Sequence, residues 1–188
     1  MNLEKFAKNG QIRPILRIGN PALIKPCLDV DIKSIDTMNI IQDMAATIQS
    51  MTGIAGLAAN QIGFQKRIMF YQVVPSRADE YNPQGVDPMF LINPYYKPVG
   101  TEKITAWESC LSTPGLAAEV ERYTIVHLTA LEWKGQDFCA IDRLVKGYEA
   151  RVIQHEIDHL DGIVYLSKRK NPQGISYVEE AKEFHIPK

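Results

Sequence analysis

The pattern HEIDH at residues 155–159 carries the clearest chemical meaning in this sequence. Residues four apart on a helix project from the same face on consecutive turns, so His155 and His159 can bind one metal ion. Glu156 lies one step round the helix, where its carboxylate can take a proton from a water that the metal acidifies. The pattern therefore predicts a metal site with an adjacent general base.

Two histidines leave such a site incomplete, because a catalytic site of this kind normally has three protein ligands and an open position for water. Two kinds of third ligand are available. Carboxylates lie downstream at Glu179, Glu180 and Glu183, as a peptidase would use, and a thiol lies upstream at Cys110. Spacing alone does not distinguish a carboxylate from a thiolate.

The helices that must position these residues can be predicted from the hydrophobic pattern. The run 148–160 contains neither Gly nor Pro and is followed by Gly162, which predicts a helix presenting the two histidines. After a capping Ser34, apolar side chains recur every three or four positions up to residue 51, which predicts an amphipathic helix of about 17 residues. A short helix is also expected over 177–184.

Strands are expected between the two long helices. The β-branched and aromatic run 67–74 predicts one strand, and the run 89–92 predicts a shorter one that ends at the Asn-Pro pair 93–94. Alternation over 123–133, followed by the run 137–141, predicts a hairpin. Strands followed by a helix favour the α+β class.

The composition is that of a folded protein of about one domain, with 188 residues of which 45% are hydrophobic and 23% charged. Residues 1–33 contain several helix breakers and are expected to form an irregular arm. Lys and Arg number 21 against 22 for Asp and Glu, so no basic field favours nucleic acid. The three cysteines are an odd number without a CxxC pair, which argues against a disulfide framework.

No membrane contact is expected, because no stretch approaches the roughly 20 apolar residues that cross a bilayer. The first ten residues lack the apolar core of a signal peptide and the Arg-rich, acid-poor pattern of a transit peptide. A cytoplasmic protein is therefore expected.

Three segments resemble motifs of one enzyme family. Residues 54–61 resemble its motif Gly-φ-Gly-φ-Ala-Ala-x-Gln, residues 108–112 resemble Glu-Gly-Cys-Leu-Ser, and residues 154–159 match Gln-His-Glu-x-Asp-His. Residues 19–23 are similar to its Gly-Asp-Pro-x-Leu segment, and the likeness spans residues 14–166. The chain thus resembles the peptide deformylases, metal-dependent hydrolases that remove the formyl group from the N-terminal formylmethionine of new polypeptides and release formate.

The resemblance implies one divalent metal ion per chain, with Cys110, His155 and His159 as ligands. Fe(II) is the expected metal, and zinc, nickel or cobalt can occupy the purified protein. Thiolate and imidazole donors accept iron and zinc alike, so iron rests on the resemblance alone. We expect a single catalytic α+β domain over residues 1–188, with antiparallel sheets around the helix that carries HEIDH and the first long helix packed outside.

The resemblance also implies how the site works. Glu156 deprotonates the water that attacks the formyl carbon and later protonates the departing amine. The side-chain amide of Gln61 and the backbone N–H of Leu111 stabilise the oxyanion.

The implied substrates are N-formylmethionyl peptides of nascent chains, bound as an added strand near Ala55, Gly56 and Ser109. A transient ribosome contact is compatible with such substrates, and no sequence-specific nucleic acid is expected.

Glu108 and Asp158 are candidates for orienting the liganding imidazoles, because a carboxylate can accept from the ring N–H that does not face the metal. Arg122 is the expected partner of Asp158.

Two positions depart from the family pattern. Ile54 replaces the first glycine of the glycine-rich motif, and Ser109 replaces the glycine before the cysteine. A positive φ at Ile54 would be strained and would alter peptide binding.

Two other functions are alternatives to a deformylase. One is a zinc peptidase that uses a downstream glutamate, and the other is a non-catalytic peptide-binding module that keeps the metal for structure.

Overall fold

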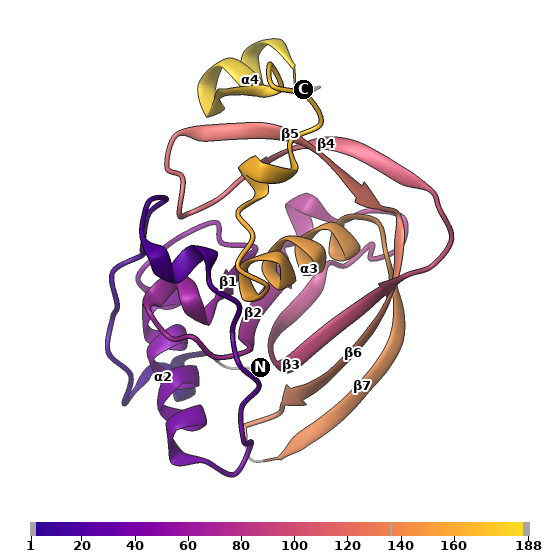
Figure 1. Cartoon of the computed structure of the whole chain (residues 1–188). Coiled ribbons are helices and arrows are strands. Elements are labelled where there is room, and N and C mark those ends of the chain that lie inside the picture. Colours follow the sequence, from indigo (N-terminus) through magenta and orange to yellow (C-terminus); the bar gives the residue numbers. More distant parts are fainter. Residues whose placement is uncertain (1–2, 136, 186–188) are drawn as a thin grey trace.

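A computed structural model describes residues 3–135 and 137–185 of the chain. Two antiparallel sheets lie around one helix, α3 (Gly147–Leu160), and a second long helix, α2 (Ile35–Gln49), packs on the far face of the larger sheet (Figure 1). The α+β class and the central position of the HEIDH helix are confirmed.

The larger sheet has five strands in the order β1-β2-β3-β6-β7, and the smaller one has three in the order β4-β5-β8. Every neighbouring pair is antiparallel. The strands are β1 (Gly56–Ala58), β2 (Ile68–Val73), β3 (Val86–Pro98), β4 (Lys103–Ser109), β5 (Leu116–Tyr123), β6 (Ile125–Trp133), β7 (Phe138–Lys146) and β8 (Ile175–Tyr177). The remaining helices are α1 (Leu3–Ala7), α4 (Val178–Phe184) and the 3-10 turns Pro21–Ile24, Ala59–Ile62, Pro75–Arg77 and Tyr165–Lys168.

Strand β2 explains why both faces of the larger sheet are covered. Side chains alternate along a strand, so Ile68 and Phe70 point to one face while Met69 and Tyr71 point to the other. The first pair packs in a core with α2, and the second pair packs in a core with α3. Full burial of each such side chain stabilises the fold by about 1.5–3 kcal/mol. The same strand therefore fixes α3 against the sheet.

Strand β3 is longer than predicted, because the Asn-Pro pair 93–94 does not end it. Ile92 lies opposite Leu131 of β6, and Tyr95 lies opposite Thr129, so the register shifts between Ile92 and Tyr95. Asn93 takes a φ of +49°, and Pro94 has no N–H to donate to a ladder. The pair thus forms a bulge, after which pairing resumes.

The helix predictions agree with the structure except at the N-terminus. Ser34 caps α2 by accepting from the Asp36 N–H at 3.2 Å, and α4 covers most of the expected C-terminal helix. The predicted hairpin is β6 and β7, and β7 extends to Lys146. The arm is irregular apart from α1 and the turn Pro21–Ile24.

Strands β4 and β5 were not predicted from the sequence. Their residues mix strand formers such as Ile, Trp, Val and Tyr with Ala, Glu and Lys, which have low preference for strands, so the local pattern is ambiguous and the tertiary structure sets their pairing. This hairpin is essential to the site, because β4 leads directly to Cys110.

The arm wraps against the C-terminal end of α3. Gly162 has a φ of +76°, and a Cβ there would lie 2.9 Å from the backbone carbons of Ile24 and Lys25. The Cys27 N–H also donates to the Leu160 carbonyl at 2.7 Å. Glycine is therefore needed at this position for close approach as well as for the turn.

Cys27, Cys110 and Cys139 are all free thiols, as the odd cysteine count suggested. Over residues 3–135 and 137–185, every helix is too short or too polar to span a membrane.

Candidate metal centre and active site

Helix α3 places His155 and His159 on adjacent turns, with ring centroids 5.0 Å apart. His159 is fully buried and His155 is nearly so. The four-residue spacing therefore places both imidazoles on one face of the helix, as expected. Both face the start of the segment that follows β4.

Cys110 reaches these histidines from the turn between β4 and β5. The turn is held by the Thr113 N–H, which donates to the Cys110 carbonyl at 3.0 Å, and by the Leu116 N–H, which donates to the Thr113 carbonyl at 3.1 Å. The Cys110 Sγ lies 3.1 Å from His159 Nε2. One ligand atom from each of Cys110, His155 and His159 lies within 4.8 Å of the other two.

This cluster suits a divalent metal ion in its donor chemistry. A thiolate and two imidazoles form a ligand set that zinc and iron both accept. His155 Nδ1 lies 2.9 Å from Glu108 Oε2, which leaves the other ring nitrogen of His155 available to a metal. The Cys110 Sγ and the His159 Nε2, 3.1 Å apart, are close enough to share a proton or to bind one metal ion.

The electrostatics of the cluster favour the same conclusion. Burial by itself would raise the pKa of the Cys110 thiol, but His159 and His155 outweigh it and hold that pKa well below its usual value. Burial would likewise lower the pKa of His155, but Cys110 and Glu108 hold it well above its usual value. The surroundings of Cys110 thus favour its thiolate form, and the thiolate together with Glu108 favours a positive charge at the cluster.

Glu108 connects the ligand cluster to a buried network of ion pairs. Its carboxylate accepts from Arg122 at 2.8 and 2.9 Å and from Arg151 at 2.6 Å, in addition to its contact with His155. Burial opposes ionisation of Glu108, but Arg122 and His155 outweigh it and hold its pKa far below the usual range. Glu108 therefore stays charged and holds the His155 ring in one orientation.

Asp158 has a different role from the one considered for it. Its carboxylate pairs with Arg122, as expected, and also with Lys168 at 2.6 Å. Among the described residues its carboxylate is hydrogen-bonded to these two cations and to neither imidazole, so it acts on the cluster only through Arg122 and Glu108. The Nδ1 of His159 has no hydrogen-bond partner among the described residues.

Glu156 is buried beside the ligand cluster, against Gly56 of β1. A Cβ on Gly56 would lie 2.3 Å from Glu156 Oε1, so only glycine lets the carboxylate occupy this place. Glu156 Oε2 is buried without a hydrogen-bond partner in the described part of the chain. Burial raises the pKa of Glu156 to about 7, in the range where a carboxyl can both accept and release a proton near neutral pH.

Two potential donors face the same place. The side-chain amide nitrogen of Gln61 lies 3.5 Å from Cys110 Sγ and 3.1 Å from Ser112 Oγ, and its oxygen accepts from the Ala58 N–H at 2.8 Å. This orientation aims the NH₂ group of Gln61 at the cluster. The backbone N–H of Leu111 makes no hydrogen bond to a described residue, and Leu111 lines the adjoining cavity.

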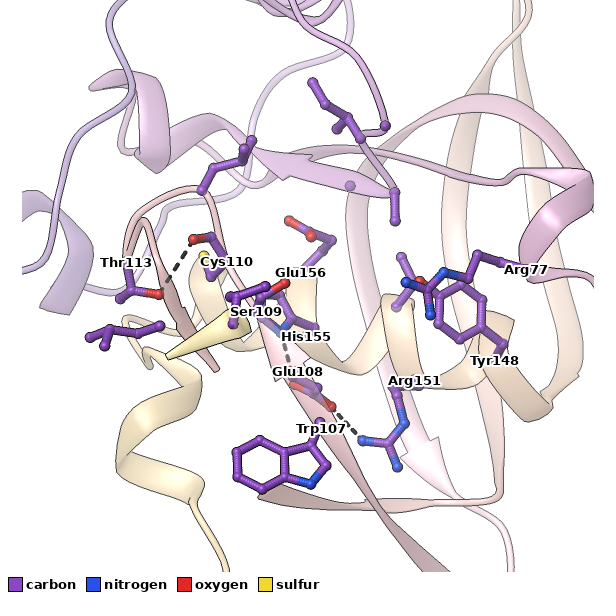
Figure 2. A pocket seen from close by; sticks show the side chains of 18 of the residues that line it. Arg77, Trp107, Glu108, Ser109, Cys110, Thr113, Tyr148, Arg151, His155 and Glu156 are labelled. Atoms are coloured by element: carbon purple, nitrogen blue, oxygen red, sulfur yellow. Dashed lines mark hydrogen bonds and ion pairs between the residues drawn. The ribbon is translucent and has the colours of Figure 1, made fainter. Parts of the chain in front are cut away.

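A cavity of about 630 Å³ opens over the cluster, between β1 on one side and the end of β4 on the other (Figure 2). Ala55, Gly56 and Ser109 all line it, as the strand-addition hypothesis requires. Strand β1 is an edge strand of the larger sheet and β4 is an edge strand of the smaller one, so unpaired backbone borders the cavity on both sides.

The departure at Ile54 causes no backbone strain. Asn93 is the only non-glycine residue with a positive φ in the described ranges, whereas Gly53, one position earlier, has a φ of +73°. The displaced glycine therefore supplies the turn, and Ile54 is free to line the cavity with its apolar side chain.

Further residues at the cavity were missed in the sequence. Tyr148, Arg151 and Val152 line it from α3, and their spacing before His155 places them on one helix face, so helical periodicity could have identified them. Arg77 and Trp107 line it from other elements. No local pattern points to these two, because only the fold brings them to the site.

The peptidase alternative is not supported by the structure. Glu179, Glu180 and Glu183 are exposed on α4 and do not belong to the cluster formed by Cys110, His155 and His159. The cluster contains the thiol in place of a downstream carboxylate.

Comparisons with known proteins agree with this geometry. The sequence profile of the polypeptide deformylase family matches residues 12–174. Peptide deformylase 1 of Nitrosomonas europaea is 35% identical over 174 residues, which cover 89% of this chain and 93% of the relative. The peptide deformylase of Aquifex aeolicus is 38% identical over 161 residues, covering 85% and 88%.

Solved structures give the same result. A peptide deformylase from Synechococcus elongatus in complex with actinonin superposes with a TM-score of 0.72 at 28% identity, over 91% of this chain and 84% of that one. A class I type b peptide deformylase from Acinetobacter baumannii bound to Met-Ala-Ser gives a TM-score of 0.70 at 26% identity, over 84% and 98%. The chain belongs to the polypeptide deformylase family.

Proposed function

We propose that the protein is a metal-dependent peptide deformylase that hydrolyses the N-formyl group of N-terminal formylmethionine on newly made polypeptides and releases formate. The observation that carries this proposal is the convergence of Cys110, His155 and His159 beside the buried Glu156, at the base of a cavity bordered by two strand edges. Membership of the deformylase family supports the same activity.

Cys110, His155 and His159 would hold the metal, and we propose Fe(II) as the native ion. A divalent ion bound there would act as a Lewis acid toward the formyl group and lower the pKa of water. Zinc, nickel or cobalt are expected to occupy the site in some preparations, because thiolate and imidazole ligands do not exclude them.

Glu156 is the proposed base and acid. Its buried carboxylate, with a pKa raised by burial to about 7, is positioned to accept a proton from the attacking water. The same group then delivers this proton to the amine nitrogen as the C–N bond breaks, which leaves formate and a free N-terminus.

Gln61 and Leu111 are the proposed oxyanion donors. The Gln61 NH₂ group is fixed by the contact of its oxygen with Ala58, and the Leu111 N–H has no competing acceptor among the described residues. Removing one good donor of this kind typically costs about 3 kcal/mol of transition-state stabilisation.

The substrate backbone is proposed to bind between the two edges, next to Ala55 and Gly56 on β1 and Ser109 at the end of β4. An extended peptide there can form main-chain hydrogen bonds while its side chains enter the cavity. The Acinetobacter protein was solved with the tripeptide Met-Ala-Ser bound, which supports a peptide-binding site in this family.

Because the proposed substrates are nascent chains, the proposed reaction takes place in the cytoplasm. Residues 1–188 are proposed to form one catalytic domain. A transient ribosome contact would bring the enzyme to its substrate, and co-sedimentation with ribosomes would detect it. No sequence-specific contact with nucleic acid is proposed.

The direct test is an anaerobic assay of formate release from formyl-Met-Ala-Ser, with metal analysis of the same sample. We expect Cys110→Ala to abolish both metal retention and turnover, whereas the matched controls Glu179→Ala and Glu180→Ala keep both. The reverse result would support the peptidase.

Glu156→Ala separates an enzyme from a peptide-binding module. We expect this variant to retain its metal and to lose kcat by about 10²–10⁴-fold, because the proton transfer is lost while the ligands remain. Undiminished formate release by this variant would exclude Glu156 as the base, and no formate release by the metal-loaded parent protein would exclude the deformylase.

A further inference from the structure

Arg77 stands at the end of the cavity away from the ligand cluster, beside Tyr148 (Figure 2). We propose that it gives the enzyme a preference for peptides with an acidic side chain at the third position, counting formylmethionine as the first. This inference rests on the proposed function and adds a substrate preference to it.

The register of the sheet shows where a bound peptide leads. Gly56 of β1 lies opposite Tyr71 of β2, and the Gln72 N–H and side chain donate to the carbonyls of Ala55 and Ile54. Because the two segments run antiparallel, the segment that follows β2 passes beside Gly53. That segment contains Arg77, within the 3-10 turn Pro75–Arg77.

The reacting end of the peptide is fixed by Glu156, which lies against Gly56. In the direction of Leu57 the chain is fully buried, whereas Gly56 and Ala55 are partly exposed and Gly53, after the buried Ile54, is exposed. The peptide must therefore leave along the edge from Gly56 to Gly53. At a rise of roughly 3.3 Å per residue, this edge accommodates about three residues.

The charge of Arg77 is unused in the described part of the chain. Its guanidinium lies 5.9 Å from the centre of the Tyr148 ring and forms no ion pair with a described residue. The other arginine at the cavity, Arg151, is neutralised by Glu108, and its NH2 group donates to the Ile104 carbonyl at 2.7 Å. Arg77 is thus the cationic group of the cavity that is available to a ligand.

The backbone around Arg77 is well anchored. Pro75 begins the 3-10 turn, and the Arg77 N–H donates to the Val74 carbonyl at 2.8 Å. Asp79, the nearest acid that follows, uses its carboxylate to accept from the Tyr148 N–H at 2.7 Å and the Asn82 N–H at 2.9 Å. Asp79 therefore ties the loop to the start of α3 and is occupied with backbone donors.

The test compares three C-terminally amidated peptides, formyl-Met-Ala-Asp, formyl-Met-Ala-Ser and formyl-Met-Ala-Lys, so that the third side chain carries the only difference in charge. For the parent enzyme at low salt, we expect kcat/KM to be about twofold to fivefold higher for the Asp peptide than for the Ser peptide, the size that an exposed ion pair supplies. In Arg77→Ala this ratio should approach one, and Arg77→Glu should instead prefer the Lys peptide. Lys97→Glu on β3 makes the same change in net charge away from the cavity and should keep the parent ratio.

The possible outcomes distinguish this inference from the proposed function. Formate release with the same Asp-to-Ser ratio in the parent and in Arg77→Glu would overturn the role of Arg77 and leave the deformylase activity standing. If no peptide is deformylated, the proposed function fails. Calorimetric binding of Met-Ala-Asp amide and Met-Ala-Ser amide then still decides the role of Arg77, because equal affinities would refute it.

Discussion

Glu108 connects one candidate ligand, His155, to a buried network of ion pairs. It accepts from His155 and from two buried arginines, Arg122 and Arg151, and it is itself buried. Arg122 in turn pairs with Asp158 on the same helix as the histidines. The network therefore links the orientation of an imidazole on α3 to strands β4 and β5.

Glu108→Gln is expected to weaken both metal binding and the fold. Loss of the carboxylate leaves Arg151 without a counter-charge and removes a charged acceptor from His155, so metal affinity should fall by about 10–100-fold. Breaking a buried ion pair from one side should lower the free energy of unfolding by about 3–5 kcal/mol. Metal titration and urea denaturation measure the two effects.

The matched control is Glu121→Gln on β5, where Glu121 pairs with Lys103 across 3.4 Å in an exposed position. This change should cost less than about 1 kcal/mol of stability and leave metal affinity unchanged. Equal effects of the two substitutions would contradict the orienting role of Glu108.

Among the elements, β3 continues through the bulge at Asn93 and Pro94 because contacts with the N-terminal arm hold the bulge in place. The side chain of Asn93 accepts from the Val30 N–H at 2.9 Å and donates to the Val30 carbonyl at 3.1 Å. The bulge thus ties the N-terminal arm to the larger sheet. Tyr95, just after it, stacks against Arg67 at 4.0 Å and donates to Asp29 of the arm at 2.7 Å.

Two substitutions at Asn93 separate its hydrogen bonds from its backbone conformation. Asn93→Gly loses both contacts with Val30 and should lower the free energy of unfolding by about 1–3 kcal/mol. Asn93→Ala should lose about 1 kcal/mol more, because alanine does not readily adopt the positive φ. Urea denaturation of the two variants would contradict this account if their stabilities were equal.

For the whole molecule, the ligand cluster is a junction between the sheets. Cys110 follows the smaller sheet, whereas α3 packs against the larger one. A metal bound to both would stabilise the native chain over the unfolded chain, where the ligands are far apart.

Removal of the metal should therefore lower the melting temperature. At a free metal concentration of about 100 times Kd, binding contributes about 2.7 kcal/mol. For a chain of this size, that corresponds to a fall in Tm of about 5–11 °C when a chelator is added. Differential scanning calorimetry measures this shift.

Cys110→Ala is the control for this measurement, since a variant that holds no metal should melt at the same temperature with and without chelator. An unchanged Tm in the parent protein after verified metal loss would show that the cluster does not connect the two sheets energetically.

The sequence alone determined those features that depend on neighbours along the chain. The spacing of His155 and His159, the Ser34 cap of α2 and the alternation in β6 all arise from contacts within a few residues, so they could be recognised directly. The motifs at residues 54–61, 108–112 and 154–159 added the family and its expected ligands.

Which distant residues meet depends on the packing of the complete chain. Cys110 and His159 are 49 positions apart, and their contact depends on the pairing of β4 with β5, whose residues have mixed strand preferences. The same holds for Arg77, which reaches the cavity because β2 pairs with β1, and for the bulge at Asn93, which β6 and the arm hold in place. Such contacts depend on the packing of the whole chain, and no short stretch of sequence contains both partners.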